Sequence, residues 1–177
     1  MVNSANIASG LKTITKSNTS HFPKCGIRFL WSDSFNLKTN PSSLRAGLQQ
    51  WGLTPAGEHE SYFQTFDHGF RNVLAEIRAN GPLQESGTIV VCGHYDHVGL
   101  GNRSNSYGPI GLIHNGADDN ASGVAALLEL ARCLVRLQSS LKKNVLFIFW
   151  DGEERGLLGS RYWLEHPTVP LDQLHLV

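Results

Sequence analysis

The sequence predicts an α/β fold with a largely parallel sheet, and two patterns support this prediction. Continuous apolar runs, typical of strands buried on both faces, occupy residues 88–92 and 144–150. Apolar residues at helical spacing follow each run, at 121–137 and 157–165. Because strands and helices alternate along the chain, we expect parallel strands covered by helices.

The remaining elements are less regular. Residues 1–40 are rich in Ser, Asn, Thr and Lys and are expected to form a loosely ordered extension before a domain over 41–177. Within that domain we expect a helix at 41–52, strands at 62–66 and 72–78, and the start of a third buried strand at 174–177.

The composition excludes several classes of protein. Of the 177 residues, 41% are apolar and 17% are charged, as in globular domains. Lys+Arg and Asp+Glu both number 15, so there is no basic excess to indicate a nucleic-acid or membrane-surface partner. There is no apolar stretch of 18 residues, and residues 1–20 lack the apolar core of a signal peptide. Taken by itself, this chain reads as cytoplasmic and without a membrane span, and the location of the protein is left open.

The three cysteines give no sign of a metal or redox motif. Cys25, Cys92 and Cys133 are widely spaced, with no Cys-x-x-Cys pair, and no disulfide framework is predicted. Cys92 lies in an apolar run and Cys133 on an apolar helix face, so both are expected to be buried thiols.

Polar residues gather where the predicted strands end and the first long helix begins. His94 and Asp96 follow the first buried run, and an Asp near a ligating His commonly accepts its second ring N–H. Asp118 and Asp119 precede the helix at 121–137. One such residue suffices to cap a helix, whereas a carboxylate can also bridge two metal ions.

Three carboxylates follow the second buried strand within four residues, at Asp151, Glu153 and Glu154. Their mutual repulsion has to be relieved by solvent or by cations. Metal-dependent hydrolysis needs a ligand and a base beside one water, roles that adjacent Glu residues can share. Carboxylates and imidazole at one sheet edge suit zinc, and also manganese or cobalt.

These segments resemble the di-zinc aminopeptidases of metallopeptidase family twenty-eight. The resemblance covers about 44–177 and is most specific over 93–160. The segments that carry it are 94–96 (HYD), 116–123 (GADDNASG) and 149–160 (FWDGEERGLLGS). It implies a three-layer sandwich with a mixed, largely parallel sheet, incomplete at its C-terminal side.

The resemblance also implies a role for each residue. His94 would bind one zinc ion, with Asp96 orienting its ring, and Glu154 would bind the other. Asp119 would bridge the two ions, and Glu153 would be the general base that takes a proton from the attacking water. The implied substrate is a peptide with a free N-terminus.

The family has two further ligands, an Asp at the end of the next strand and a later His. The chain ends at Val177 before either is reached; Asp172 precedes the expected strand and His175 lies within it, so neither is expected to substitute. Each zinc ion would keep two of its three protein ligands. We therefore expect a truncated member with impaired activity.

Two alternatives remain. Glutaminyl cyclases share this fold, use one zinc ion and have a similar acidic turn, although residues 155–160 here look aminopeptidase-like. The other alternative is an inactive, peptidase-like binding module. The retained Glu153 argues against it, because a binding module needs no base, whereas the expected truncation argues for it.

Overall fold

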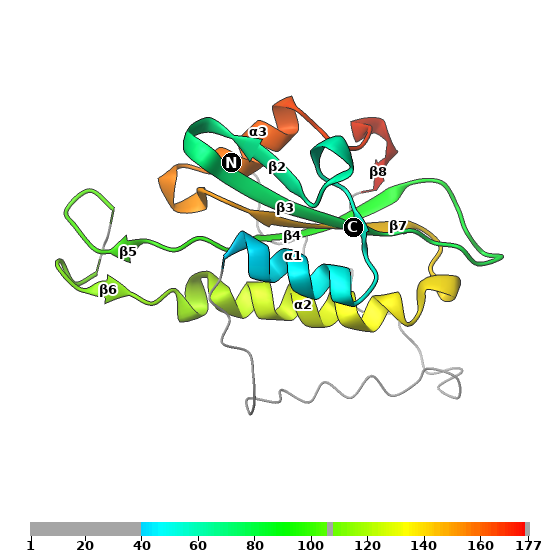
Figure 1. Ribbon diagram of the computed structural model, residues 1–177, viewed down its shortest axis with the longest axis horizontal. Helices are drawn as coiled ribbons and strands as arrows, with labels where there is room; N and C mark the ends of the chain where they lie inside the picture. Colours follow the sequence, from blue (N-terminus) through cyan, green and yellow to red (C-terminus); the bar gives the residue numbers. More distant parts are fainter. Residues whose placement is uncertain (1–39, 106–107, 176–177) are drawn as a thin grey trace, which may run out of the picture. The chain divides into compact units, whose positions relative to one another are not determined.

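The computed structural model describes residues 40–105 and 108–175 (Figure 1). Apart from Asn40, the predicted N-terminal extension lies outside the described residues. Within the described residues, none of the helices is long and apolar enough to cross a membrane.

A mixed sheet forms the centre of the domain, as the resemblance implies, with two parallel and three antiparallel strand pairings among the described residues. Its strand order is β1-β3-β7-β4-β8, and β2 also pairs with β3. The strands are β1 (Thr54–Pro55), β2 (Phe63–Phe66), β3 (Phe70–Ile77), β4 (Thr88–His94), β7 (Asn144–Trp150) and β8 (Leu174–His175).

Antiparallel and parallel pairing divide this sheet into two parts. β3 pairs antiparallel with β1, β2 and β7, whereas β4 pairs parallel with both β7 and β8. The parallel part contains the strands that precede the predicted site residues. A separate antiparallel pair, β5 (Gly99–Leu100) with β6 (Ile113–His114), extends beyond the end of the sheet (Figure 1).

Helices cover both faces of the sheet and make three layers. α1 (Pro41–Gln50) and α2 (Ser122–Val135) pack on one face, and α3 (Leu158–Glu165) packs on the other (Figure 1). Short helical turns complete the described chain: η1 (Glu58–Glu60), η2 (Asp67–Gly69), η3 (Ala117–Ala121), η4 (Gln138–Ser140), η5 (Glu153–Arg155) and η6 (Leu171–Gln173).

Strand β7 shows how the sequence pattern produces the layers. Val145, Phe147 and Phe149 pack with α1 and α2, whereas Leu146 and Ile148 pack with Trp163 of α3. All five side chains are buried, as expected of a strand covered on both faces. β7 is therefore the rigid support from which the acidic turn at Asp151 begins.

The prediction that β4 is buried on both faces is wrong for most of the strand, since only Thr88 is buried and the residues after it are half-buried or exposed. Cys92 is exposed, not a buried thiol. It pairs in register with Ile148, which places it on the face of α3. α3 packs over β3 and β7. Among the described residues, the carboxyl end of β4 is therefore left uncovered on the face where α3 packs.

The expectation for Cys133 is also wrong. Its sulfur is disulfide-bonded and its side chain is half-buried. The buried side of α2 is formed by Val124, Leu127, Leu128 and Ala131, so position 133 lies outside the face that packs on the sheet.

Candidate active site

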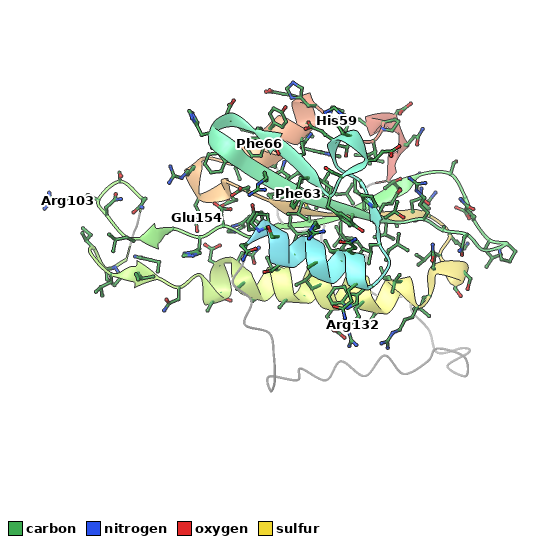
Figure 2. The ribbon with its side chains drawn as sticks, viewed as in Figure 1. His59, Phe63, Phe66, Arg103, Arg132 and Glu154 are labelled. Atoms are coloured by element: carbon green, nitrogen blue, oxygen red, sulfur yellow. The ribbon has the colours of Figure 1, made fainter. Side chains whose placement is uncertain are left out.

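The predicted site residues meet at the carboxyl edge of the parallel strands. His94 ends β4 and is paired in register with Trp150, the last residue of β7. The backbone N–H of Tyr95 donates to the Trp150 carbonyl at 3.0 Å, so the two loops leave the sheet together. Figure 2 shows Glu154 in the turn after β7, at the end of the sheet from which β5 and β6 extend.

His94 is the centre of the contacts. Its Nε2 lies 2.9 Å from Asp119 Oδ1 and 3.9 Å from Glu153 Oε2. The His94 side chain is only 12% exposed, whereas that of Asp119 is 76% exposed and that of Glu153 is 34% exposed. The imidazole is therefore fixed by its surroundings, whereas the two carboxylates are open to solvent. A substrate that enters from solvent could reach them.

Asp96 connects His94 to the acidic turn. Its backbone oxygen lies 3.1 Å from His94 Nδ1, and its carboxylate Oδ1 lies at 3.5 Å. The same carboxylate accepts backbone N–H bonds from Glu153 at 3.1 Å and from Glu154 at 3.2 Å. A proton on Nδ1 directed at Asp96 leaves Nε2 with a free lone pair, the form that binds metals.

A tight turn brings the two Glu residues beside His94. Gly152 has φ +65°, where a side chain would be strained, and its N–H is bonded by Asp151 Oδ1 at 2.9 Å. The other carboxylate oxygen of Asp151 accepts the Arg71 N–H at 2.9 Å. The turn is thus fixed at its start to the neighbouring strand β3.

Negative charge accumulates in this turn. Burial raises the pKa of the Glu154 carboxyl, and the charges of Asp119 and Glu153 raise it further, while His94 opposes the shift. A bound cation would relieve this repulsion. The electrostatics therefore favour cation binding at this edge.

Tyr95 lies beneath the site and was not singled out from the sequence. Burial raises the pKa of its phenol, and the nearby Asp151 carboxylate raises it further, so the hydroxyl stays protonated. The hydroxyl donates to the Arg71 carbonyl at 2.8 Å. Tyr95 thereby connects the loop after β4 to β3.

Asn120 is a further residue of the site that sequence reasoning did not assign. Its Oδ1 accepts the Gly123 N–H at 3.1 Å, and its Nδ2 donates to the His94 carbonyl at 3.4 Å. It therefore links the start of α2 to the end of β4, which brings Asp119 to His94. The only signal in the sequence was its place beside Asp119.

The donor atoms are of the kind that zinc prefers, but they form only part of a coordination shell. His94 Nε2 and Asp119 Oδ1 are an imidazole nitrogen and a carboxylate oxygen in contact. Among the described residues, His, Cys, Asp and Glu form no group of three or more arranged to hold a metal ion. Zinc thus fits the chemistry of the donors, and the described part of the chain brings two of them together.

Neither Asp172 nor His175 extends this set. Asp172 lies in η6 before β8, and His175 pairs with Ile89, well before His94 along β4. His175 Nε2 instead lies 3.3 Å from Lys143 Nζ. Both residues are thus at the opposite end of the strands, in agreement with the expectation that neither replaces a ligand.

Comparisons with known proteins indicate the family of this chain. The family described as Peptidase family M28 matches residues 72–177. "Aminopeptidase YwaD" of Bacillus subtilis is 37% identical over 114 residues, which are 64% of this chain and 22% of that protein. "BOS complex subunit ncln" of Danio rerio is 40% identical over 82 residues, 44% of this chain and 13% of that protein.

Among solved structures, Porphyromonas gingivalis glutaminyl cyclase superposes with a TM-score of 0.56 at 26% identity, over 72% of this chain and 46% of that one. The chain spans about a quarter or less of the length of the curated relatives. The family match nevertheless includes most of β3, all of β4, α2 and β7, and the position of every residue of the predicted site. The chain belongs to Peptidase family M28.

Proposed function

We propose that this chain carries catalytic residues of a zinc-dependent aminopeptidase, which removes N-terminal residues from peptides. The contact of His94 Nε2 with Asp119 Oδ1 at 2.9 Å, with Glu153 Oε2 at 3.9 Å, is the observation that carries the proposal. It combines a metal-binding pair with a carboxylate that is free to accept a proton. The family membership and the aminopeptidase relatives support the same class of reaction.

His94, Asp119 and Glu154 are the residues that would hold zinc. Asp119 has two carboxylate oxygens and is the most exposed of the contacting groups, so it suits a bridge between two ions. When bound, zinc would supply Lewis-acid polarisation of the scissile carbonyl and an anchor for the substrate's free amine.

Glu153 is proposed as the general base. Its side chain is partly exposed, and its backbone N–H donates to the Asp96 carboxylate. The backbone bond fixes the position of the residue and leaves the Glu153 carboxylate available to a water molecule. It would take a proton from the attacking water and then deliver it to the leaving amine. Asp96 would orient both the His94 ring and the turn that carries the base.

We further propose that these 177 residues alone bind zinc weakly and turn over slowly. The described residues bring two donors into contact, whereas a catalytic zinc ion normally has three protein ligands. Missing donors would leave each ion loosely held.

Glutaminyl cyclisation is the second candidate. The likeness to the P. gingivalis glutaminyl cyclase favours it, since it covers 72% of this chain. A cyclase releases ammonia from an N-terminal Gln, whereas an aminopeptidase releases the residue itself.

Mass spectrometry of peptide products tests the proposal. The natural protein, purified from its own cells, and the 177-residue chain would each be incubated with zinc and with Leu-Ala-Phe, Gln-Ala-Phe or N-acetylated Leu-Ala-Phe. We expect loss of the first residue from the free peptides, no cleavage of the acetylated one, and loss of activity with a chelator. Ammonia loss from the Gln peptide alone would favour the cyclase, and no product in the natural protein would contradict the proposed aminopeptidase.

A further inference from the structure

A buried pair of amide side chains connects strands β2 and β3 to the turn that carries Glu153 and Glu154. Gln64 and Asn72 are both 0% exposed and are partners in the β2–β3 register. Asn72 Nδ2 donates to Gln64 Oε1 at 3.1 Å. Buried amides away from water are costly unless they are fully hydrogen-bonded, so the remaining bonds of this pair decide its role.

Asn72 directs its other bonds to the two ends of the acidic turn. Its Oδ1 accepts the backbone N–H of Asp151 at 3.1 Å, immediately after β7. Its Nδ2 donates to the carbonyl of Gly159 at 2.9 Å, in the first turn of α3. One side chain therefore holds both ends of the segment 151–159, within which Glu153 and Glu154 lie.

Gln64 fixes which way the Asn72 amide points. Gln64 Nε2 donates to the His166 carbonyl at 2.7 Å, which leaves its Oε1 to face Asn72. A reversed Asn72 amide would place oxygen against oxygen and N–H against N–H. The acceptor of Asn72 is thus directed at Asp151.

Gly159 permits the close approach from the other side. A Cβ at this position would collide with Asn72 Oδ1 and with the Asp151 carbonyl oxygen. The Gly159 N–H donates to that same carbonyl at 3.0 Å. The start of the acidic turn, α3 and Asn72 therefore form one packed unit without space for a side chain.

We infer that Asn72 is a positioning residue for the metal-binding turn. It touches neither Glu side chain; it sets the backbone that carries both, of which Glu153 reaches to 3.9 Å from His94 Nε2. The inference deepens the proposed function, because its consequence for zinc rests on Glu154 being a ligand.

The other end of β7 supplies a matched control. Asn144 Oδ1 accepts the backbone N–H of Ala79 at 3.0 Å. As with Asn72, an Asn side chain thus connects β7 with the segment of β3 by a bond to the backbone. It lies at the amino end of β7, away from the acidic turn. Asn144→Ala removes the same chemical group as Asn72→Ala without touching the turn.

The experiment compares Asn72→Ala, Gly159→Ala and Asn144→Ala in the full 177-residue chain. Hydrogen–deuterium exchange without metal reports on segment 151–158, and calorimetric titration with zinc reports on affinity. The visible spectrum of bound cobalt(II) reports on ligand geometry. We expect both turn variants to exchange faster over 151–158, to alter the cobalt spectrum, and to bind zinc about 10–100-fold more weakly. We expect Asn144→Ala to leave the exchange over 151–158, the cobalt spectrum and the zinc affinity unchanged. This should hold even if Asn144→Ala lowers the melting temperature as much as Asn72→Ala does.

Unchanged exchange and zinc affinity in Asn72→Ala would overturn the inference, and so would an equal loss in Asn144→Ala. If Asn72→Ala does not fold, Gln64→Met takes its place. Faster exchange over 151–158 and weaker zinc binding, by less than in Gly159→Ala, would support the role of Asn72, and no change in either would overturn it. A wild-type chain that binds no zinc would contradict the assignment of zinc ligands in this chain, while the exchange comparison would still decide whether Asn72 positions the turn.

Discussion

Replacing Glu153 with Gln is expected to slow removal of N-terminal residues by about 10²–10⁴-fold, the usual contribution of a positioned general base. The amide has nearly the same shape as the carboxylate but does not accept a proton from water. Glu153 Oε2 lies 3.9 Å from His94 Nε2, beside the proposed metal ligands rather than among them. Zinc affinity should therefore stay close to that of the unchanged protein.

Steady-state kinetics on Leu-Ala-Phe, together with zinc titration, checks this prediction in the natural protein. Glu165→Gln is the matched control, because it makes the same chemical change at an exposed acid at the end of α3. Its rate should not change. Turnover that survives in Glu153→Gln would show that another group is the base, and a parallel loss of zinc would show that Glu153 is a ligand.

Replacing His94 with Ala is expected to weaken zinc binding by more than about 100-fold, since even residues that only support a ligand contribute 10–100-fold. His94 supplies the only imidazole in contact with the carboxylates of the site among the described residues. Removing it leaves carboxylates alone, which repel one another and suit zinc less well.

A calorimetric titration with zinc measures the change in affinity. His175→Ala is the control, since it removes an imidazole from the far end of the adjoining strand, where His175 pairs with Ile89. We expect it to bind zinc as the unchanged chain does. Equal zinc affinity in His94→Ala and the unchanged chain would mean that zinc binds elsewhere.

The features that the sequence predicted best are those set by local pattern. β7 was predicted at its observed bounds because its apolar run is uninterrupted, and α2 within two residues because its apolar face repeats at helical spacing. The gathering of His94 with the acidic turn followed from a general rule, that parallel strands bring their carboxyl ends to one edge.

The features that were missed depend on contacts between distant segments. Cys92 sits in an apolar run, yet its exposure is decided by where α3 packs. Asn72 has no local signal, because its partners at Asp151 and Gly159 are some eighty residues away.

Asp96 illustrates both cases. Its spacing from His94 predicted an orienting role, which stays a prediction; His94 Nδ1 lies 3.1 Å from the Asp96 backbone oxygen and 3.5 Å from its carboxylate. The two N–H bonds that its carboxylate accepts from Glu153 and Glu154 were not foreseen, because they join loops that only the parallel pairing of β4 and β7 brings together.

The most direct test of the zinc site is a crystal structure of the chain soaked with zinc, with data collected at the zinc absorption edge. We expect an anomalous peak about 2.0–2.2 Å from both His94 Nε2 and an Asp119 oxygen, the usual zinc–ligand distance. Zinc bound only at other places, with His94 and Asp119 still in direct contact, would contradict the assignment.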